Sequence, residues 1–114
     1  MSRRNHHIDY IEFTAPDLDA VKAFYGPVFG WTFQDWGPDY ISFGEAGVDG
    51  GFRREPVRPG VAPLVVLYAE DLEATEVRVR TAGVPILKPI FSFPGGRRFH
   101  FADPAGNELA VWGE

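Results

Sequence analysis

The sequence contains one short pattern twice, and this internal duplication limits what the chain can fold into. Asp17-Leu18-Asp19-Ala20 and Asp71-Leu72-Glu73-Ala74 lie 54 residues apart. Both leading aspartates are typical of helix N-caps, because an aspartate carboxylate accepts hydrogen bonds from the free N–H groups of a first helical turn. The chain has 114 residues, which is the common size of one domain. We therefore expect two copies of one small unit within a single domain.

The predicted elements follow the same order around both patterns. In the first half, an alternating strand at 8–14 precedes a helix in which Phe24 and Tyr25 are expected in the core. Turn-forming Gly and Pro residues then separate short strands at 31–36, 40–43 and 48–53. The second half repeats this order with a strand at 63–69, a helix ending near Gly83, and strands at 84–91, 97–102 and 108–112.

This order predicts an α+β fold of two βαβββ modules that form a curved mixed sheet around a trough. Residues 1–114 are expected to be one domain, with module one at about 7–54, a proline-containing linker at about 55–62 and module two at about 63–113. Each module has one helix, which can cover only one face of its sheet. The other face is then available to line a ligand site.

Composition and charge exclude several classes of function. The net charge of −5 offers no cationic face for nucleic acid, and the pairs Arg3-Arg4 and Arg53-Arg54 are interpreted as aids to solubility. Without cysteine there are no disulfides, thiol nucleophiles or thiolate metal sites. The polar N-terminus and the lack of a long apolar run predict a cytoplasmic protein with no membrane partner.

The last predicted hairpin resembles that of a known superfamily. Phe101, Asp103, Pro104, Gly106 and Asn107 match the Phe-x-Asp-Pro-x-Gly-Asn turn of the vicinal-oxygen-chelate (VOC) superfamily. That group includes glyoxalase I, extradiol dioxygenases, and bleomycin- and fosfomycin-resistance proteins. The segment 23–31 is similar to the end of the family's first helix. The resemblance implies a glyoxalase/bleomycin-resistance-like fold from about residue 8 to 112, and a homodimer, as in the bleomycin-resistance branch.

The resemblance also indicates where a metal ion would be held. It places the family's metal-ligand positions at Tyr10, Leu64, Ala110 and, less directly, Gly51. Leu, Ala and Gly side chains cannot ligate a divalent ion, and neutral Tyr is a poor ligand. We therefore predict no catalytic metal and no cofactor. An alternative ligand set lacks the family's spacing; it consists of His7, Glu12, His100 and Glu108.

Strand alternation, together with the resemblance, predicts which side chains line the trough. Glu12 and His100 are the candidate catalytic residues, because both can transfer protons. Arg98 could bind a carboxylate or phosphate, and Tyr10, Tyr68, Glu108 and Trp112 complete the predicted ligand-binding set. Two other interpretations stay open. Arg98 with Glu108 and His100 with Glu12 could be structural ion pairs, and the aromatic residues could form a dimer interface.

These residues support several hypotheses of function. The first is a protein that binds a small aromatic or amphipathic molecule in a metal-free trough. The second is a metal-independent isomerase or lyase in which Glu12 or His100 is the base and Arg98 stabilises developing negative charge. The third is a metal-dependent lyase or dioxygenase with atypical ligands, and the fourth is a purely structural or regulatory module.

Overall fold

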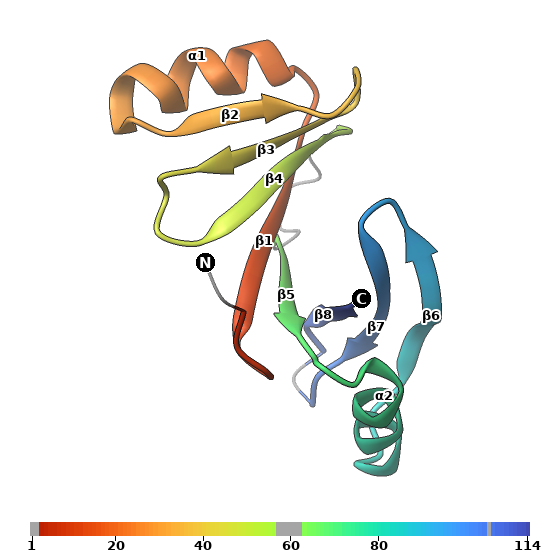
Figure 1. Cartoon of the computed structure of the whole chain (residues 1–114). Helices are drawn as coiled ribbons and strands as arrows, with labels where there is room; N and C mark the ends of the chain where they lie inside the picture. Colours follow the sequence, from red (N-terminus) through yellow and green to blue (C-terminus); the bar gives the residue numbers. More distant parts are fainter. Residues whose placement is uncertain (1–2, 57–62, 105) are drawn as a thin grey trace. The chain divides into compact units, whose positions relative to one another are not determined.

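The structure, a computed structural model, describes residues 3–56, 63–104 and 106–114 (Figure 1). Most of the predicted linker, from residue 57 to 62, and Ala105 of the predicted turn lie outside the described residues. The first half consists of β1 (Ile8–Ala15), α1 (Leu18–Phe29), β2 (Thr32–Asp35), β3 (Tyr40–Gly44) and β4 (Asp49–Arg54). The second half consists of β5 (Leu64–Tyr68), α2 (Leu72–Thr81), β6 (Ile86–Phe93), β7 (Gly96–Ala102) and β8 (Glu108–Gly113).

The chain divides into two compact units, which we describe separately. One begins at Tyr10 and contains the rest of the first half, and it is called module one below. The other, module two, combines residues 64–114 with the N-terminal segment up to Asp9. The N-terminal segment thus contributes side chains to the second module, although it precedes the first in the sequence.

Both modules have the same strand order, and the predicted α+β class with two βαβββ modules is confirmed. Module one has the order β2-β3-β4-β1, in which β1 and β4 are parallel and the other pairs are antiparallel. Module two has the order β6-β7-β8-β5, again with one parallel pair, β5 with β8. The sequence duplication is therefore a structural duplication as well.

Both helices begin at the predicted N-caps. The Ala20 N–H donates to Asp17 Oδ1 at 3.1 Å, and the Ala74 N–H donates to Asp71 Oδ1 at 3.0 Å. Such bonds satisfy backbone donors that have no partner within the helix. At the other end of α1, Gly30 takes a left-handed φ of 77°, which glycine adopts without a steric penalty.

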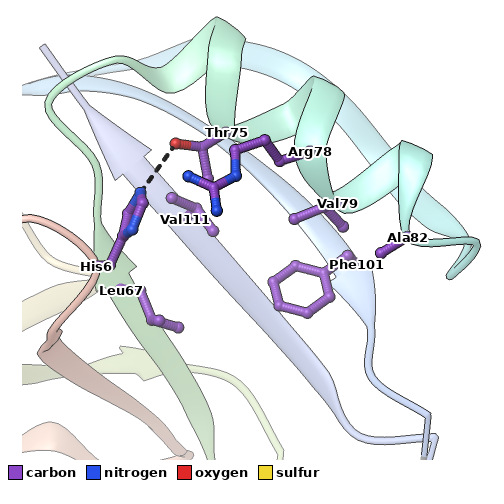
Figure 2. Close-up of a pocket in the computed structure, with 8 residues that line it drawn as sticks. All are labelled: His6, Leu67, Thr75, Arg78, Val79, Ala82, Phe101 and Val111. Atoms are coloured by element: carbon purple, nitrogen blue, oxygen red, sulfur yellow. Dashed lines mark hydrogen bonds between the residues drawn. The ribbon is translucent and has the colours of Figure 1, made fainter.

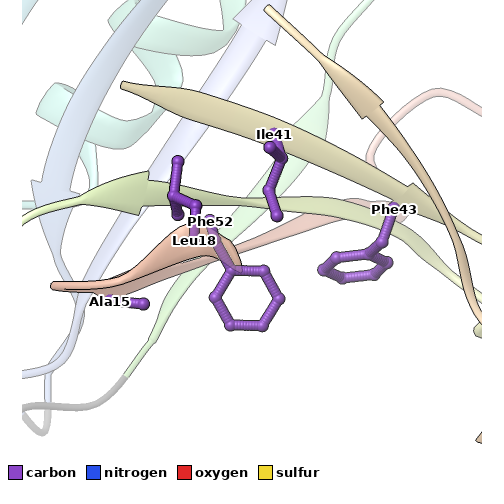
Figure 3. Packing of buried hydrophobic residues seen from close by; sticks show 5 residues of the cluster. All are labelled: Ala15, Leu18, Ile41, Phe43 and Phe52. Atoms are coloured by element: carbon purple, nitrogen blue, oxygen red, sulfur yellow. The ribbon is translucent and has the colours of Figure 1, made fainter. Parts of the chain in front are cut away.

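The core of each module lies between its helix and one face of its sheet. In module one, aromatic rings dominate this core, and Phe13 stacks on Phe52 at 5.1 Å between centroids. Figure 3 shows the five buried residues of this cluster, which are Ala15, Leu18, Ile41, Phe43 and Phe52. In module two the buried residues are Ala69, Leu72, Phe99 and Val111.

The expectation for the aromatic pair on α1 is half correct. Tyr25 packs against the core and stacks on Trp31 at 4.4 Å. Phe24 is 51% exposed, so its prediction as a core residue was wrong. Adjacent helical residues point about 100° apart, so the two rings cannot both face the sheet.

Candidate functional site

The predicted ligand residues of module two lie on one face of its sheet. Phe99 and Val111 face the helix-covered core, so their neighbours along β7 and β8 point the other way. On this far face, defined as the side away from α2, the strand register forms two rows. One row contains Val66, Ala110 and His100; the other contains Tyr68, Trp112 and Arg98. Glu108 has the same parity on β8 as Ala110 and Trp112.

His100 is held by Glu108 through one of its ring nitrogens. Nδ1 lies 2.8 Å from Glu108 Oε2, and the His100 side chain is only 4% exposed while that of Glu108 is 49% exposed. The contact is diagonal between β7 and β8, because Glu108 pairs with Ala102. His100 Nε2 is buried, and within the described part of the chain it has no hydrogen-bond partner.

The surroundings of His100 favour the neutral ring. Burial lowers its pKa below the usual 6.5; the hydrogen bond to Glu108 opposes this, and the positive charges of Arg98 and Lys88 add to the lowering. A neutral imidazole has one N–H and one lone pair. With the Glu108 carboxylate accepting from Nδ1–H, the lone pair lies on Nε2. His100 thus offers a buried acceptor that can also take up a proton.

Arg98 lies close to the same ring system. Its guanidinium carbon lies 5.6 Å from the centroid of Phe91 and 5.4 Å from that of Phe93. The Phe91 ring in turn lies 5.7 Å from the His100 ring. The far face therefore brings together a cation, an aromatic surface and a hydrogen-bond acceptor around Phe91.

A second aromatic surface on this face already has a cation on it. The Tyr68 and Trp112 rings lie 5.3 Å apart, and Trp112 Nε1–H donates to Asp9 Oδ2 at 3.0 Å. The Arg3 guanidinium lies 4.7 Å from the Trp112 ring and 5.9 Å from the Tyr68 ring. Sequence reasoning missed both Arg3 and Asp9, because no local pattern connects them to a strand about a hundred residues later.

Glu12 and Tyr10, the remaining predicted residues, belong to β1 and have partners in module one. Glu12 is 7% exposed, and its Oε2 lies 3.2 Å from Nη1 of Arg53, which the sequence reading had assigned to solubility. The Tyr10 hydroxyl lies 2.5 Å from the Tyr40 hydroxyl. In the structure, Glu12 contacts Arg53 and Glu108 contacts His100. The hypothesis of structural ion pairs had instead joined Glu12 to His100 and Glu108 to Arg98.

A pocket of about 320 Å³ lies on the other side of the module-two sheet, under α2 (Figure 2). Its wall is mostly apolar, and His6 at its edge contacts Thr75 Oγ1 at 3.4 Å. None of the predicted site residues lines it. The pocket-forming residues are His6, Leu67, Thr75, Arg78, Val79, Ala82, Phe101 and Val111.

Comparison with protein families identifies the group to which this chain is related. Residues 7–111 match the model of the Glyoxalase/Bleomycin resistance protein/Dioxygenase superfamily. The chain belongs to this superfamily. This VOC chain is 33% identical over 125 residues to the anthracycline biosynthesis protein DnrV of Streptomyces peucetius; the match covers 90% of the chain but 45% of the relative. It thus spans about half the length of that relative.

Solved structures show the same fold. A glyoxalase/bleomycin resistance protein/dioxygenase superfamily member from Vibrio splendidus superposes with a TM-score of 0.73 at 16% identity, covering 96% of this chain and 100% of that one. The Mn(II)-bound glyoxalase from Novosphingobium aromaticivorans gives 0.69 at 24% identity, covering 99% of this chain and 40% of that one.

The described residues of this VOC chain do not fit a family-type metal site. Leu64 and Ala110 occupy two of the expected ligand positions and have no donor atoms, and a side chain at Gly51 would collide with the Tyr40 ring. Among the described residues, no three His, Asp or Glu side chains gather in one place. These positions therefore cannot supply the metal ligands of the family.

Within the described ranges, neither helix is long and apolar enough to cross a bilayer.

Proposed function

We propose that this VOC protein binds a small aromatic molecule with a hydroxyl group on the far face of module two, without a metal ion. The observation that carries the proposal is the buried His100 Nε2, which has no partner among the described residues. A buried acceptor without a hydrogen bond costs about 1–3 kcal/mol. A ligand hydroxyl that donates to Nε2 removes this cost, which favours phenols over similar molecules without a donor.

The groups around His100 support the same class of ligand. Phe91 offers an aromatic face next to the imidazole, and Arg98 places a positive charge beside it. A cation stabilises the negative charge that grows on a phenol oxygen when it donates a hydrogen bond. The similarity to an anthracycline biosynthesis protein agrees with this class, because anthracyclines are polycyclic aromatic molecules with phenolic hydroxyls.

The test compares two probes that share a ring system and an oxygen atom; in the second probe a methyl group replaces the hydroxyl hydrogen. We expect isothermal titration calorimetry to detect 2-naphthol, and to detect 2-methoxynaphthalene at least about tenfold more weakly, since a tenfold ratio equals about 1.4 kcal/mol. His100→Phe should remove this preference. Arg54→Gln is the matched control, because Arg54 lies in module one and pairs with Asp39. Equal affinity for the two probes, or no binding of either, would contradict the proposal.

The proposal of a metal-free site has its own measurement. Protein purified without an affinity tag and assayed by plasma mass spectrometry should contain no stoichiometric transition metal. A stoichiometric ion that survives dialysis would restore the hypothesis of a metal-dependent enzyme.

The Glu108–His100 pair also supports a second function, acid–base catalysis without a metal. The carboxylate fixes which nitrogen carries the proton, so Nε2 is free to act as a general base. Arg98 would stabilise the enolate that forms when a proton leaves the carbon next to a carbonyl. This proposal places the base at His100, because the Glu12 carboxylate is paired with Arg53 in module one.

This second function predicts proton exchange in a simple ketone. The protein should accelerate exchange of the α-hydrogens of 1-tetralone with D₂O, followed by NMR. A positioned general base contributes about 10²–10⁴-fold to such rates, and His100→Phe should remove that acceleration. If His100→Phe exchanges the ketone as fast as the wild-type protein, His100 is not the base.

The homodimer implied by the family is also part of this proposal. Three neighbouring apolar side chains on α1, namely Phe24, Val28 and Phe29, are more than half exposed. Exposed apolar groups of this kind are typical of protein–protein interfaces. They support a second copy of the chain as the partner.

A further inference from the structure

The N-terminal segment and the far face of module two form a three-sided cage. Two sides are the rings of Tyr68 and Trp112, whose planes meet at 61°. The third is the Asp9 carboxylate, which accepts the Trp112 indole N–H. Gly96 allows the indole to lie against the β7 backbone, because a Cβ there would come within 3.0 Å of the ring. Trp112 is thus held in place by two independent contacts.

The chemistry of this cage selects organic cations. Aromatic faces carry negative electrostatic potential and attract guanidinium or ammonium groups within about 6 Å. The carboxylate adds a full negative charge on the third side. Arg3 has this chemistry, and its guanidinium lies over both rings with Nε 4.0 Å from Asp9 Oδ2.

Arg3 can leave without dismantling the cage. Its side chain is 47% exposed, whereas that of Asp9 is 22% exposed. The segment after Arg3 is fixed independently, because the His6 N–H donates to the Tyr68 carbonyl at 2.6 Å and the Tyr68 N–H donates to the His7 carbonyl at 3.1 Å. Asn5 Oδ1 also accepts the Glu70 N–H at 2.8 Å. Asp9 therefore keeps its position when Arg3 turns into solvent.

We propose that Tyr68, Trp112 and Asp9 form a subsite for an organic cation, and that Arg3 occupies it until a ligand with a guanidinium or alkylammonium group displaces it. Arg3 competes as a tethered group, at an effective concentration in the millimolar range that is typical of short linkers. Removing its side chain strengthens binding of the competing cation by a factor of one plus the ratio of this effective concentration to the dissociation constant of the Arg3 guanidinium, which is about twofold when both are millimolar. This subsite does not require the phenol site at His100.

The experiment follows the Trp112 indole N–H by ¹⁵N NMR, with assignment from Trp112→Phe. The probe is butylguanidinium, and its neutral counterpart is butylurea, both at constant ionic strength. In Arg3→Ala, butylguanidinium should shift this resonance saturably, with an affinity at least about twofold higher than in the wild type. Arg4→Ala is the matched control, since the neighbouring Arg4 is exposed, and it should behave as the wild type.

A third variant separates charge from shape. Asp9→Asn, in the Arg3→Ala background, keeps an acceptor for the Trp112 indole but removes the charge, and should weaken butylguanidinium binding by about tenfold. The proposal is overturned if butylurea binds as well as butylguanidinium, or if Arg3→Ala and Arg4→Ala bind the probe equally. Butylguanidinium binding does not depend on 2-naphthol binding. If only the phenol proposal fails, 2-naphthol does not bind while butylguanidinium still does.

Discussion

The buried, neutral His100 should make the protein less stable as the pH falls below about 6.5. Its folded-state pKa is lowered from 6.5, chiefly by burial. Below pH 6.5 the unfolded chain therefore binds a proton at this residue more readily than the folded chain. The free energy of unfolding must then fall as the pH falls, starting near the unfolded pKa and continuing down to the folded one.

The size of this effect follows from linkage for one group. If the folded ring stays neutral throughout, the free energy of unfolding drops by about 1 kcal/mol between pH 6.5 and pH 5.5. Below that the slope approaches about 1.4 kcal/mol per pH unit until the folded-state ring protonates. The burial of the side chain, at 4% exposed, means that solvent screening does little to reduce this value.

The assay is urea unfolding at half-unit steps from pH 7.5 to pH 5.0. His100→Gln cannot titrate here, so the wild type should lose more stability than this variant between pH 6.5 and pH 5.5, by up to about 1 kcal/mol. Glu108→Gln keeps the histidine but removes the charge that raises its pKa, so its pH dependence should be at least as steep as that of the wild type. Parallel curves for the wild type and His100→Gln would refute the reasoning.

Three further predictions concern the rest of the molecule. Phe99→Ala, at a position with no exposed surface, should cost about 3–5 kcal/mol in urea unfolding, whereas Val77→Ala, at an exposed position of α2, should stay within about 0.5 kcal/mol. Asp71→Ala should lower the free energy of unfolding by about 1 kcal/mol, because it removes the acceptor for the Ala74 N–H at the start of α2. Asp71→Asn keeps an acceptor and should retain most of that stability, so an equal loss in both variants would contradict the role of Asp71 as N-cap. Val28→Glu on the exposed side of α1 should convert a dimer to a monomer in light scattering after gel filtration; an unchanged mass would show that this patch is not the interface.

Local and periodic features of the sequence were enough to predict the modules. The N-caps at Asp17 and Asp71 depend on contacts only three residues apart, so they can be read directly from the chain. Strand alternation has a period of two, which is why the far-face placement of Arg98 and His100 followed from the core position of Phe99. The placement of Trp112 followed by alternation from Ala110, whose position the family resemblance supplied. Phe24 shows where this reasoning fails, because an apolar residue can also lie on the solvent side of an amphipathic helix.

The identity of each partner was decided only by the tertiary structure. His100 contacts Glu108 because the β7–β8 register places them diagonally, and Glu12 contacts Arg53 because β1 pairs with β4. Alternation specifies a face but not the neighbour across the sheet, and ion pairing depends on distances of a few ångströms. The same holds for Arg3, which the sequence suggested was a solubilising residue. Arg3 lies over Trp112 because backbone hydrogen bonds hold the N-terminal segment beside β5, and no local pattern indicates that pairing.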